Sequence, residues 1–132
     1  VTRARALALT SGLDIYVQTS RWEGMPVALI EAQVAGIPAV VTDVVGNRDV
    51  VIHGVTGYVA SNADEMSAYV AVLRDDRQLR EQMGAAARQR AIQRFSINAI
   101  FRQWNALYGL GADEPRADTR DFEPVAPDHV EA

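Results

Sequence analysis

One stretch decides the fold of this chain, Glu23-Gly24-Met25-Pro26-Val27-Ala28-Leu29-Ile30-Glu31, a loop that turns into a helix. Proline suits the first position of a helix, because its φ is fixed near a helical value and its missing N–H would have no helical partner there. We therefore expect the helix to begin at Pro26. This start leaves one carboxylate, Glu23, in the loop before the helix and another, Glu31, inside it.

The start of this helix has the properties of an anion site. The backbone amides of Gly24, Met25 and Val27 would lie at the positive end of the helix dipole, where phosphate oxygens bind readily. Glu31 lies five residues after Pro26, about 7 Å along the axis, and its side chain leans back toward the helix start. A ligand could therefore meet the amides and the carboxylate together.

Glu31 is a charged residue in an otherwise apolar helix, flanked by Ile30 and Ala32. Burying a carboxylate is costly unless a partner forms hydrogen bonds with it. A hydroxyl-rich ligand whose phosphates lie at the helix start would supply such bonds. The alternative partner is an arginine from a neighbouring helix.

The rest of the chain alternates short apolar runs with longer helical patterns. Residues 14–18, 38–42 and 57–60 are predicted strands, and the second is of the kind buried on both faces of a parallel sheet. A strand, a helix and a strand with short connections form a right-handed βαβ unit. The predicted fold class is α/β, with about three parallel strands, flanking helices and a C-terminal helical segment.

Further helices are predicted before and after this unit. The first is 2–11, with Ala6, Leu7 and Leu9 on its inner side, and the central helix ends at Gly36. The others, with their N-caps, are a short helix from Asn47 to Ile52, a helix from Asn62 to about Arg74, one from Asp75 or Asp76 to about Arg94, and one from Ser96 through Leu107.

Charge divides the chain into a body and a tail. The 132 residues carry a net charge of −4, but residues 111–132 hold seven of the 17 acidic residues and two of the 13 arginines, so the tail carries −5 and residues 1–110 carry +1. Three of the five prolines also lie in the tail, which we expect to be disordered. Residues 1–110 are the predicted domain, and the lack of a basic face predicts no nucleic-acid partner.

Several classes of site and location are disfavoured by composition. The chain has no cysteine, which excludes disulfides and thiolate metal sites. No apolar run approaches the ~20 residues that span a bilayer, and the two isolated histidines, His53 and His129, predict no metal site. The chain lacks a starting Met, and a three-stranded sheet would have an open edge. We therefore expect it to be a piece of a longer, cytoplasmic protein.

Several motifs recur together, in this order, in one known family. They are Ser20-Arg21-Trp22-Glu23-Gly24-Met25-Pro26, the Glu-x7-Glu pair, Glu31-Ala32, Gly36-Ile37-Pro38-Ala39-Val40-Val41, Thr42-Asp43, Gly46-Asn47, Gly54-Val55-Thr56-Gly57 and Arg94-Phe95-Ser96. In these motifs the chain, from about residue 8 to residue 110, resembles the C-terminal part of the nucleotide-sugar-binding domain of retaining glycosyltransferases of the two-Rossmann-domain (GT-B) type. The group is the glycogen-synthase-like and mannosyltransferase-like one, the glycosyl transferases group 1.

The resemblance implies a fold, a reaction and a site. The sheet would be half of a Rossmann-like sheet, and the enzyme would transfer a sugar from a nucleotide-diphosphate sugar to a glycan, lipid or small-molecule acceptor with retention of anomeric configuration. No metal or other cofactor would be needed. Glu23 would be the catalytic residue beside the donor sugar, and Glu31 would bind the ribose hydroxyls. The amides of Gly24, Met25 and Val27 would hold the donor diphosphate and sugar.

The resemblance also implies what the chain lacks. The family's Arg and Lys that clamp the diphosphate belong to the preceding half of the domain, and the acceptor domain lies outside the chain as well. The isolated chain is therefore expected to be inactive, and peripheral association with the inner membrane face would come through the missing regions. Val45 departs from the pattern, because many relatives have a second glycine there.

Other interpretations of the same residues remain open. The chain could be a non-catalytic remnant that binds a nucleotide or a partner chain, or part of a nucleotide-sugar epimerase of the same architecture. A glycoside hydrolase would also need two carboxylates, but nothing in the sequence indicates the required cleft. Trp22 and Trp104 are expected to be core anchors rather than sugar platforms.

Overall fold

The computed structural model describes residues 2–109, and it confirms the predicted α/β class. Three parallel strands, β1 (Tyr16–Gln18), β2 (Ala39–Thr42) and β3 (Gly57–Ala60), form one sheet in the order β1-β2-β3. The first strand is shorter than predicted, because its pairing with β2 begins only where Tyr16 lies opposite Ala39. The tail 111–132, for which disorder is expected, lies outside the described residues.

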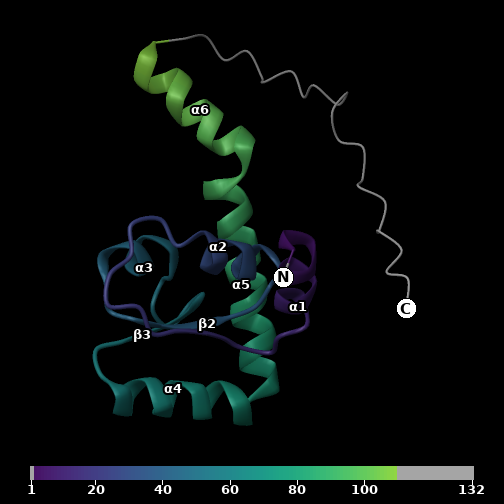
Figure 1. The fold of residues 1–132 in the computed structure, drawn as a ribbon, viewed down its shortest axis with the longest axis vertical. Coiled ribbons are helices and arrows are strands. Elements are labelled where there is room, and N and C mark those ends of the chain that lie inside the picture. Colours follow the sequence, from purple (N-terminus) through teal and green to yellow (C-terminus); the bar gives the residue numbers. More distant parts are fainter. Residues whose placement is uncertain (1, 110–132) are drawn as a thin grey trace.

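Helices cover the sheet on both faces. Within residues 2–109 they are α1 (Arg3–Ser11), α2 (Val27–Val34), α3 (Val45–Val50), α4 (Ala63–Asp75), α5 (Arg77–Phe95) and α6 (Ile97–Tyr108). Figure 1 shows α2 and α3 on one side of the strands and α4 on the other, with α5 running past all three layers and α6 extending away from them. No helix in this part of the chain combines the length and the apolar character that crossing a membrane requires.

The central strand, β2, forms the middle of the core. Successive side chains of a strand point to opposite faces of the sheet. Ala39 and Val41 pack with Leu29 of α2 in one cluster, whereas Val40 packs with Leu73 of α4 and Met83 of α5 in another, and all are buried. Both faces of β2 are therefore covered, as its apolar sequence predicts.

The predicted helix boundaries are largely confirmed by their caps. The side chains of Asn62, Asp76 and Ser96 each accept a hydrogen bond from the backbone amide three residues later. At the end of α2 the left-handed residue is Gly36, with φ of 84°. The amide of Gly36 donates to the carbonyl of Gln33 and that of Ile37 to Ala32, which is the Schellman arrangement.

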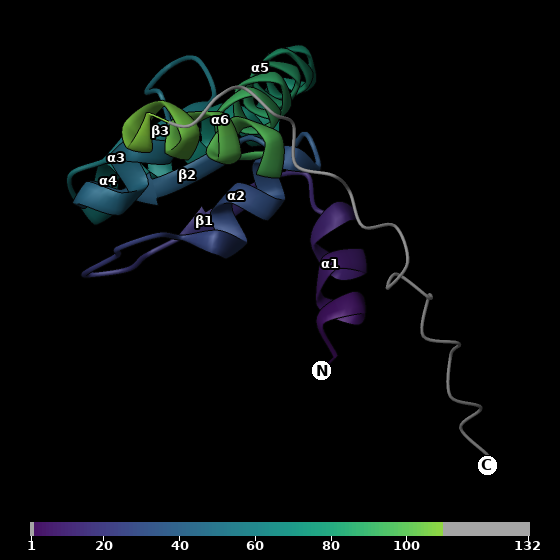
Figure 2. The same ribbon diagram turned by 90° about the horizontal axis from the view of Figure 1, so that it is seen from above.

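Two expectations about the core are wrong. Helix α1 contains no buried residue, because it lies against α2 rather than against the sheet, and Figure 2 shows it projecting from the body. The predicted inner side of Ala6, Leu7 and Leu9 is therefore exposed. Trp22 and Trp104 are not core anchors either, since 82% and 56% of their surfaces are exposed. The first lies in the β1–α2 loop and the second on the projecting α6.

The outer edge of β3 is covered by the turn that precedes it. The outward amide of Val59 donates to Nδ1 of His53 (3.1 Å), and the amide of Gly54 donates to the carbonyl of Gly57 (2.8 Å). The His53 ring also meets the rings of Tyr58 and Tyr69 edge-on, at centroid distances of 5.5 and 5.4 Å. His53 therefore holds this edge in place.

Helix α5 crosses the end of α2 with direct backbone contact. A Cβ on Gly84 would overlap the carbonyl oxygen of Gly36, so α5 has no room for a side chain where it meets the turn after α2. Gly84 is buried in the middle of α5, where glycine otherwise weakens a helix by up to about 1 kcal/mol relative to alanine. The close approach explains why glycine is nevertheless needed.

Gly84→Ala should therefore destabilise the fold despite the better helix propensity of alanine. We expect the free energy of unfolding to fall by about 1–3 kcal/mol, because the added methyl group must push α5 away from α2. Gly12→Ala is the matched control, since the nearest atom to its added Cβ would be 3.6 Å away. Urea unfolding of both variants measures the difference, and a Gly84→Ala variant as stable as the control would contradict the steric explanation.

Candidate functional site

Glu23 lies in the loop between β1 and α2, at the carboxyl end of the strands. Ligands of open α/β sheets bind outside this end. Its Oε1 accepts two hydrogen bonds, from the hydroxyl of Ser20 (2.6 Å) and from the side-chain amide of Gln18 (3.0 Å). Hydrogen bonds to an ionised carboxylate are among the stronger ones, so this half-buried side chain is held in one position.

The hydrogen bonds to Glu23 continue into the sheet. Nε2 of Gln18 also donates to Oδ1 of Asn47 (3.0 Å), and Oε1 of Gln18 accepts from the Tyr16 hydroxyl (3.1 Å). Nδ2 of Asn47 donates to the carbonyl of Thr42 at the end of β2 (3.0 Å). The carboxylate is thereby tied to the carboxyl ends of both β1 and β2.

The prediction that Asn47 caps the short helix is wrong. Helix α3 begins at Val45, two residues earlier, and Val44 is in the cap position without a side-chain hydrogen bond. Asn47 is fully buried within α3, where its amide bonds both Gln18 and Thr42. A buried amide must find partners, and here they lie across the sheet rather than at the helix start.

Gly46 brings the backbone of α3 against the Glu23 loop. A Cβ at this position would lie 2.5 Å from the carbonyl oxygen of Gly24 and 2.8 Å from that of Glu23. Val45, where the sequence departs from the family pattern, points outward and is 67% exposed. The close approach therefore depends on Gly46 alone, and the valine does not obstruct it.

The start of α2 differs in detail from the prediction. Pro26 precedes the helix, with φ of −78° and ψ of 80°, and the first helical residue is Val27. This backbone turn directs the amide of Val27 to the carbonyl of Met25 (2.9 Å), as in an inverse γ-turn. The amides of Gly24 and Met25 have no hydrogen-bond partner among residues 2–109. Two of the three predicted donors are thus available, and the third is engaged within the loop.

Glu31 lies in α2 and is paired with an arginine. Its Oε1 is 3.0 Å from Nη2 of Arg3 in α1, and 28% of the Glu31 side chain is exposed, against 81% for Arg3. The carboxylate also lines a cavity of about 400 Å³ between α1 and α2. An ion pair this exposed to water contributes little stability, so a ligand could replace Arg3 at little cost.

Both predicted site carboxylates affect the pKa of Tyr16. The pKa of its phenol is raised from the ordinary value of 10.0, mainly by burial and further by the charges of Glu23 and Glu31. The hydroxyl therefore stays protonated at neutral pH and serves as the donor to Gln18. Both carboxylates therefore act electrostatically on the same phenol.

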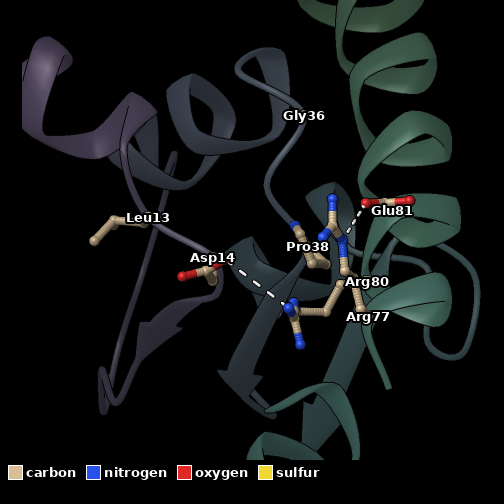
Figure 3. Close-up of a pocket in the computed structure, with 7 residues that line it drawn as sticks. All are labelled: Leu13, Asp14, Gly36, Pro38, Arg77, Arg80 and Glu81. Atoms are coloured by element: carbon tan, nitrogen blue, oxygen red, sulfur yellow. Dashed lines mark hydrogen bonds and ion pairs between the residues drawn. The ribbon is translucent and has the colours of Figure 1, made fainter. Parts of the chain in front are cut away.

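Another cavity lies at the amino end of the strands, away from Glu23. It measures about 450 Å³ and is lined by Leu13, Asp14, Gly36, Pro38, Arg77, Arg80 and Glu81. Figure 3 shows its charged side chains in pairs, with Arg77 bonded to Glu81 (2.8 Å) and Arg80 facing Asp14 (4.0 Å). Because both arginines have acidic partners, this cavity offers no unpaired charge to a ligand.

Most of the chain matches one known protein family. The family model "Glycosyl transferases group 1" matches residues 2–90. The chain belongs to the group 1 glycosyltransferases. The predicted resemblance, including the Rossmann-like α/β fold of the GT-B type, is therefore confirmed.

Similar proteins include bacterial glycosyltransferases. The chain is 28% identical over 104 residues to the capsular polysaccharide biosynthesis glycosyltransferase CapM of Staphylococcus aureus, covering 77% of this chain and 27% of CapM. It is 32% identical over 108 residues to the N,N'-diacetylbacillosaminyl-diphospho-undecaprenol alpha-1,3-N-acetylgalactosaminyltransferase of Campylobacter jejuni, covering 80% and 28%. The chain therefore spans less than a third of the length of these relatives.

Solved structures share the fold. Anabaena HepE in complex with UDP and glucose superposes with a TM-score of 0.73 at 25% identity, over 81% of this chain and 30% of HepE. Sucrose-phosphate synthase from Thermosynechococcus elongatus superposes with a TM-score of 0.74 at 23% identity, over 83% and 28%. The second likeness is one of fold alone.

The residues that position Glu23 in this group 1 glycosyltransferase domain could not be recognised from the sequence. Gln18 ends a predicted strand, and Asn47 follows Gly46 in a pattern that suits a cap equally well. The signal available was a pair of amide side chains, each shortly before or after the carboxyl end of a predicted strand. Parallel strands bring such positions to the same edge of the sheet.

Gly46→Ala should displace the loop that carries Glu23. We expect the backbone amide signals of residues 18–25 to shift in heteronuclear NMR spectra, and the free energy of unfolding to fall by about 1–3 kcal/mol, because the methyl group overlaps two carbonyl oxygens. Val45→Ala, next to it and exposed, should leave the loop signals in place. Unchanged loop signals in Gly46→Ala would show that the close approach does not position Glu23.

Proposed function

We propose that this chain forms the donor-binding part of a retaining glycosyltransferase that transfers a sugar from a nucleotide-diphosphate sugar to an acceptor. The observation that carries the proposal is the loop geometry, in which a fixed carboxylate, Glu23, directly precedes the unpartnered amides of Gly24 and Met25. The complexes of HepE with UDP and with UDP-glucose support a nucleotide-sugar donor.

The proposed roles follow from charge and position. The donor diphosphate would accept hydrogen bonds from Gly24 and Met25 beside the positive end of the α2 dipole, and the amide of Val27 would join them once its bond to Met25 opens. Negative charge that develops on the leaving diphosphate is stabilised by such preoriented donors. We propose that this reaction uses no metal and no other cofactor.

The two carboxylates would act on different parts of the donor. Glu23, held by Ser20 and Gln18, would stabilise the positive charge that develops on the donor sugar. Glu31 would exchange Arg3 for the ribose hydroxyls, which suits its half-exposed position beside a cavity. The order of these residues along the loop and α2 would put sugar, diphosphate and ribose in sequence.

The acceptor and the location are part of the same proposal. The Campylobacter jejuni relative carries a diphospho-undecaprenol-linked sugar in its name, which supports a lipid-linked or glycan acceptor. We propose a cytoplasmic enzyme that associates peripherally with the inner membrane face through regions outside this chain. The chain alone would bind donor without transferring sugar, because the residues that clamp the diphosphate would come from elsewhere.

Glu31→Ala should weaken the binding of UDP about tenfold to a hundredfold, because hydrogen bonds between a ribose and a carboxylate are lost. Arg3→Ala is the matched control: it removes the same ion pair but frees Glu31, so UDP should bind as well as to the wild type or more tightly. Isothermal titration calorimetry measures both. If Arg3→Ala weakens binding as much as Glu31→Ala, the ion pair rather than a ribose contact is responsible.

Glu23→Gln should lower sugar transfer at least about a hundredfold, the usual effect of losing one electrostatic stabiliser. Glutamine keeps an acceptor oxygen for Ser20 and Gln18, so the loop geometry and UDP affinity should remain. The measurement uses the protein as its source cells make it, with its size determined by immunoblot, and radiolabelled UDP-glucose followed by screening of other nucleotide sugars.

The stereochemistry of the product tests the rest of the proposal. Proton NMR of the isolated product should show the anomeric configuration of the donor. Inversion would contradict the retaining mechanism, and conversion of the donor sugar without any acceptor would indicate an epimerase instead. Transfer that survives Glu23→Gln would remove Glu23 from the catalytic role.

A further inference from the structure

A separate small cavity lies where all three strands end, beside the Glu23 loop. It measures about 270 Å³ and is lined by Thr19, Thr42, Asp43, Ala60, Ser61, Asn62, Ala63 and Met66. These residues follow β1, end β2, and connect β3 to the start of α4. Its volume is below the range typical of sites for drug-sized ligands, so it suits a group of the size of one sugar ring.

The rim of this cavity carries hydrogen-bonding groups without partners. In the described part of the chain, the hydroxyls of Thr19 and Ser61 make no hydrogen bond. Asn62 uses its Oδ1 to cap the amide of Glu65 (2.9 Å), which leaves its NH₂ group available, and Oε2 of Glu65 in turn accepts from the amide of Ser61 (2.8 Å). The backbone that carries these groups is thus fixed while the groups themselves are free.

The remaining lining residues supply a carboxylate and an apolar floor. Asp43 is anchored by its amide, which donates to the carbonyl of Ala60 (3.0 Å), and its Oδ1 lies 3.3 Å from Nε of Arg48. Ala60 is buried and Met66 is half-buried. Hydroxyl, amide and carboxylate groups around an apolar floor match a sugar ring, which has hydroxyls at its rim and C–H groups on its face.

The charge of the cavity argues against a phosphate ligand. Among its lining residues are one carboxylate and no arginine or histidine. The charge of Asp43 is paired with Arg48 at 3.3 Å, so the cavity offers no free cation to hold a diphosphate. The group that binds here is therefore an uncharged, hydroxylated one rather than the leaving diphosphate of the donor.

The cavity is connected to Glu23 by two short hydrogen bonds. The hydroxyl of Thr42, in the cavity wall, donates to the carbonyl of Ser20 (2.6 Å), and the hydroxyl of Ser20 donates to Glu23 (2.6 Å). The donor amides belong to residues that follow Glu23, whereas the cavity is built from residues before it and from the ends of β2 and β3. A single residue, Ser20, thus separates the cavity from the predicted catalytic carboxylate.

We propose that this cavity binds a sugar ring of the acceptor, with Thr19, Ser61 and Asn62 as hydrogen-bonding residues and Met66 beneath the ring. The proposal rests on the proposed glycosyltransferase function, and it corrects the expectation that all acceptor contacts lie outside this chain: the donor-binding part would supply one wall of the acceptor site. It makes the carboxyl end of β3 a specificity-determining part of the site, because the number and direction of the rim groups select the hydroxyl pattern of the acceptor.

The test uses the double variant Thr19→Val and Ser61→Ala, which removes two exposed hydroxyls and little volume. Ser67→Ala, an exposed serine on α4 outside the cavity, is the matched control. The protein is taken as its source cells make it, with radiolabelled nucleotide sugar as donor and a lipid and glycan extract of those cells as acceptor. The KM for acceptor should rise about tenfold, as expected for two lost hydrogen bonds, while the KM for donor stays unchanged.

The possible results separate this inference from the proposed function. A raised KM for donor with an unchanged KM for acceptor would assign the sugar ring to the donor and overturn the acceptor assignment. Kinetics equal to those of Ser67→Ala would overturn the sugar site altogether. If the wild-type protein transfers no sugar, or if Glu23→Gln transfers as well as the wild type, the proposed function itself fails.

Discussion

The hydrogen bond between the side chains of Gln18 and Asn47 joins the sheet to the site. It connects the end of β1 with α3, and the same Gln18 amide holds Glu23. Two amides can satisfy each other only in one orientation, since each offers a distinct donor and acceptor. The Tyr16 hydroxyl donates to the amide oxygen of Gln18, which determines that orientation. The position of the carboxylate is therefore a property of the sheet rather than of a flexible loop.

Two glycines let backbone segments meet directly and so set the positions of the helices. Gly46 admits the Glu23 loop against α3, and Gly84 admits the end of α2 against α5. The two contacts fix the two ends of the segment 23–36. Gly46 holds the loop at its start, and Gly84 holds the Gly36 turn at its end. The predicted phosphate-binding amides lie between these two fixed points, which favours a preorganised site.

The pattern of the chain predicted much of the fold because the relevant signals are local. The apolar run at 38–42, the caps at Asn62 and Ser96, and the turn at Gly36 each act within a few residues, and the structure bears them out. What could not be predicted depends on contacts distant in sequence. An arginine partner for Glu31 was one of the alternatives, but which arginine it is, like the burial of Asn47 and the exposure of Trp104, is decided by which elements meet. Spacing alone carries no such information.

The covered outer edge of β3 leaves only the β1 side of the sheet open to a further strand. Its outward Val59 amide and Gly57 carbonyl are already occupied by His53 and Gly54, whereas β1 pairs only with β2 in the described part of the chain. A strand that enlarges this sheet can therefore add only beside β1, because a parallel neighbour needs unpaired backbone groups. Any such strand would form backbone hydrogen bonds with β1, the strand that ends at Gln18. Because the Gln18 side chain holds Glu23, pairing at this edge of the sheet would also affect the position of Glu23.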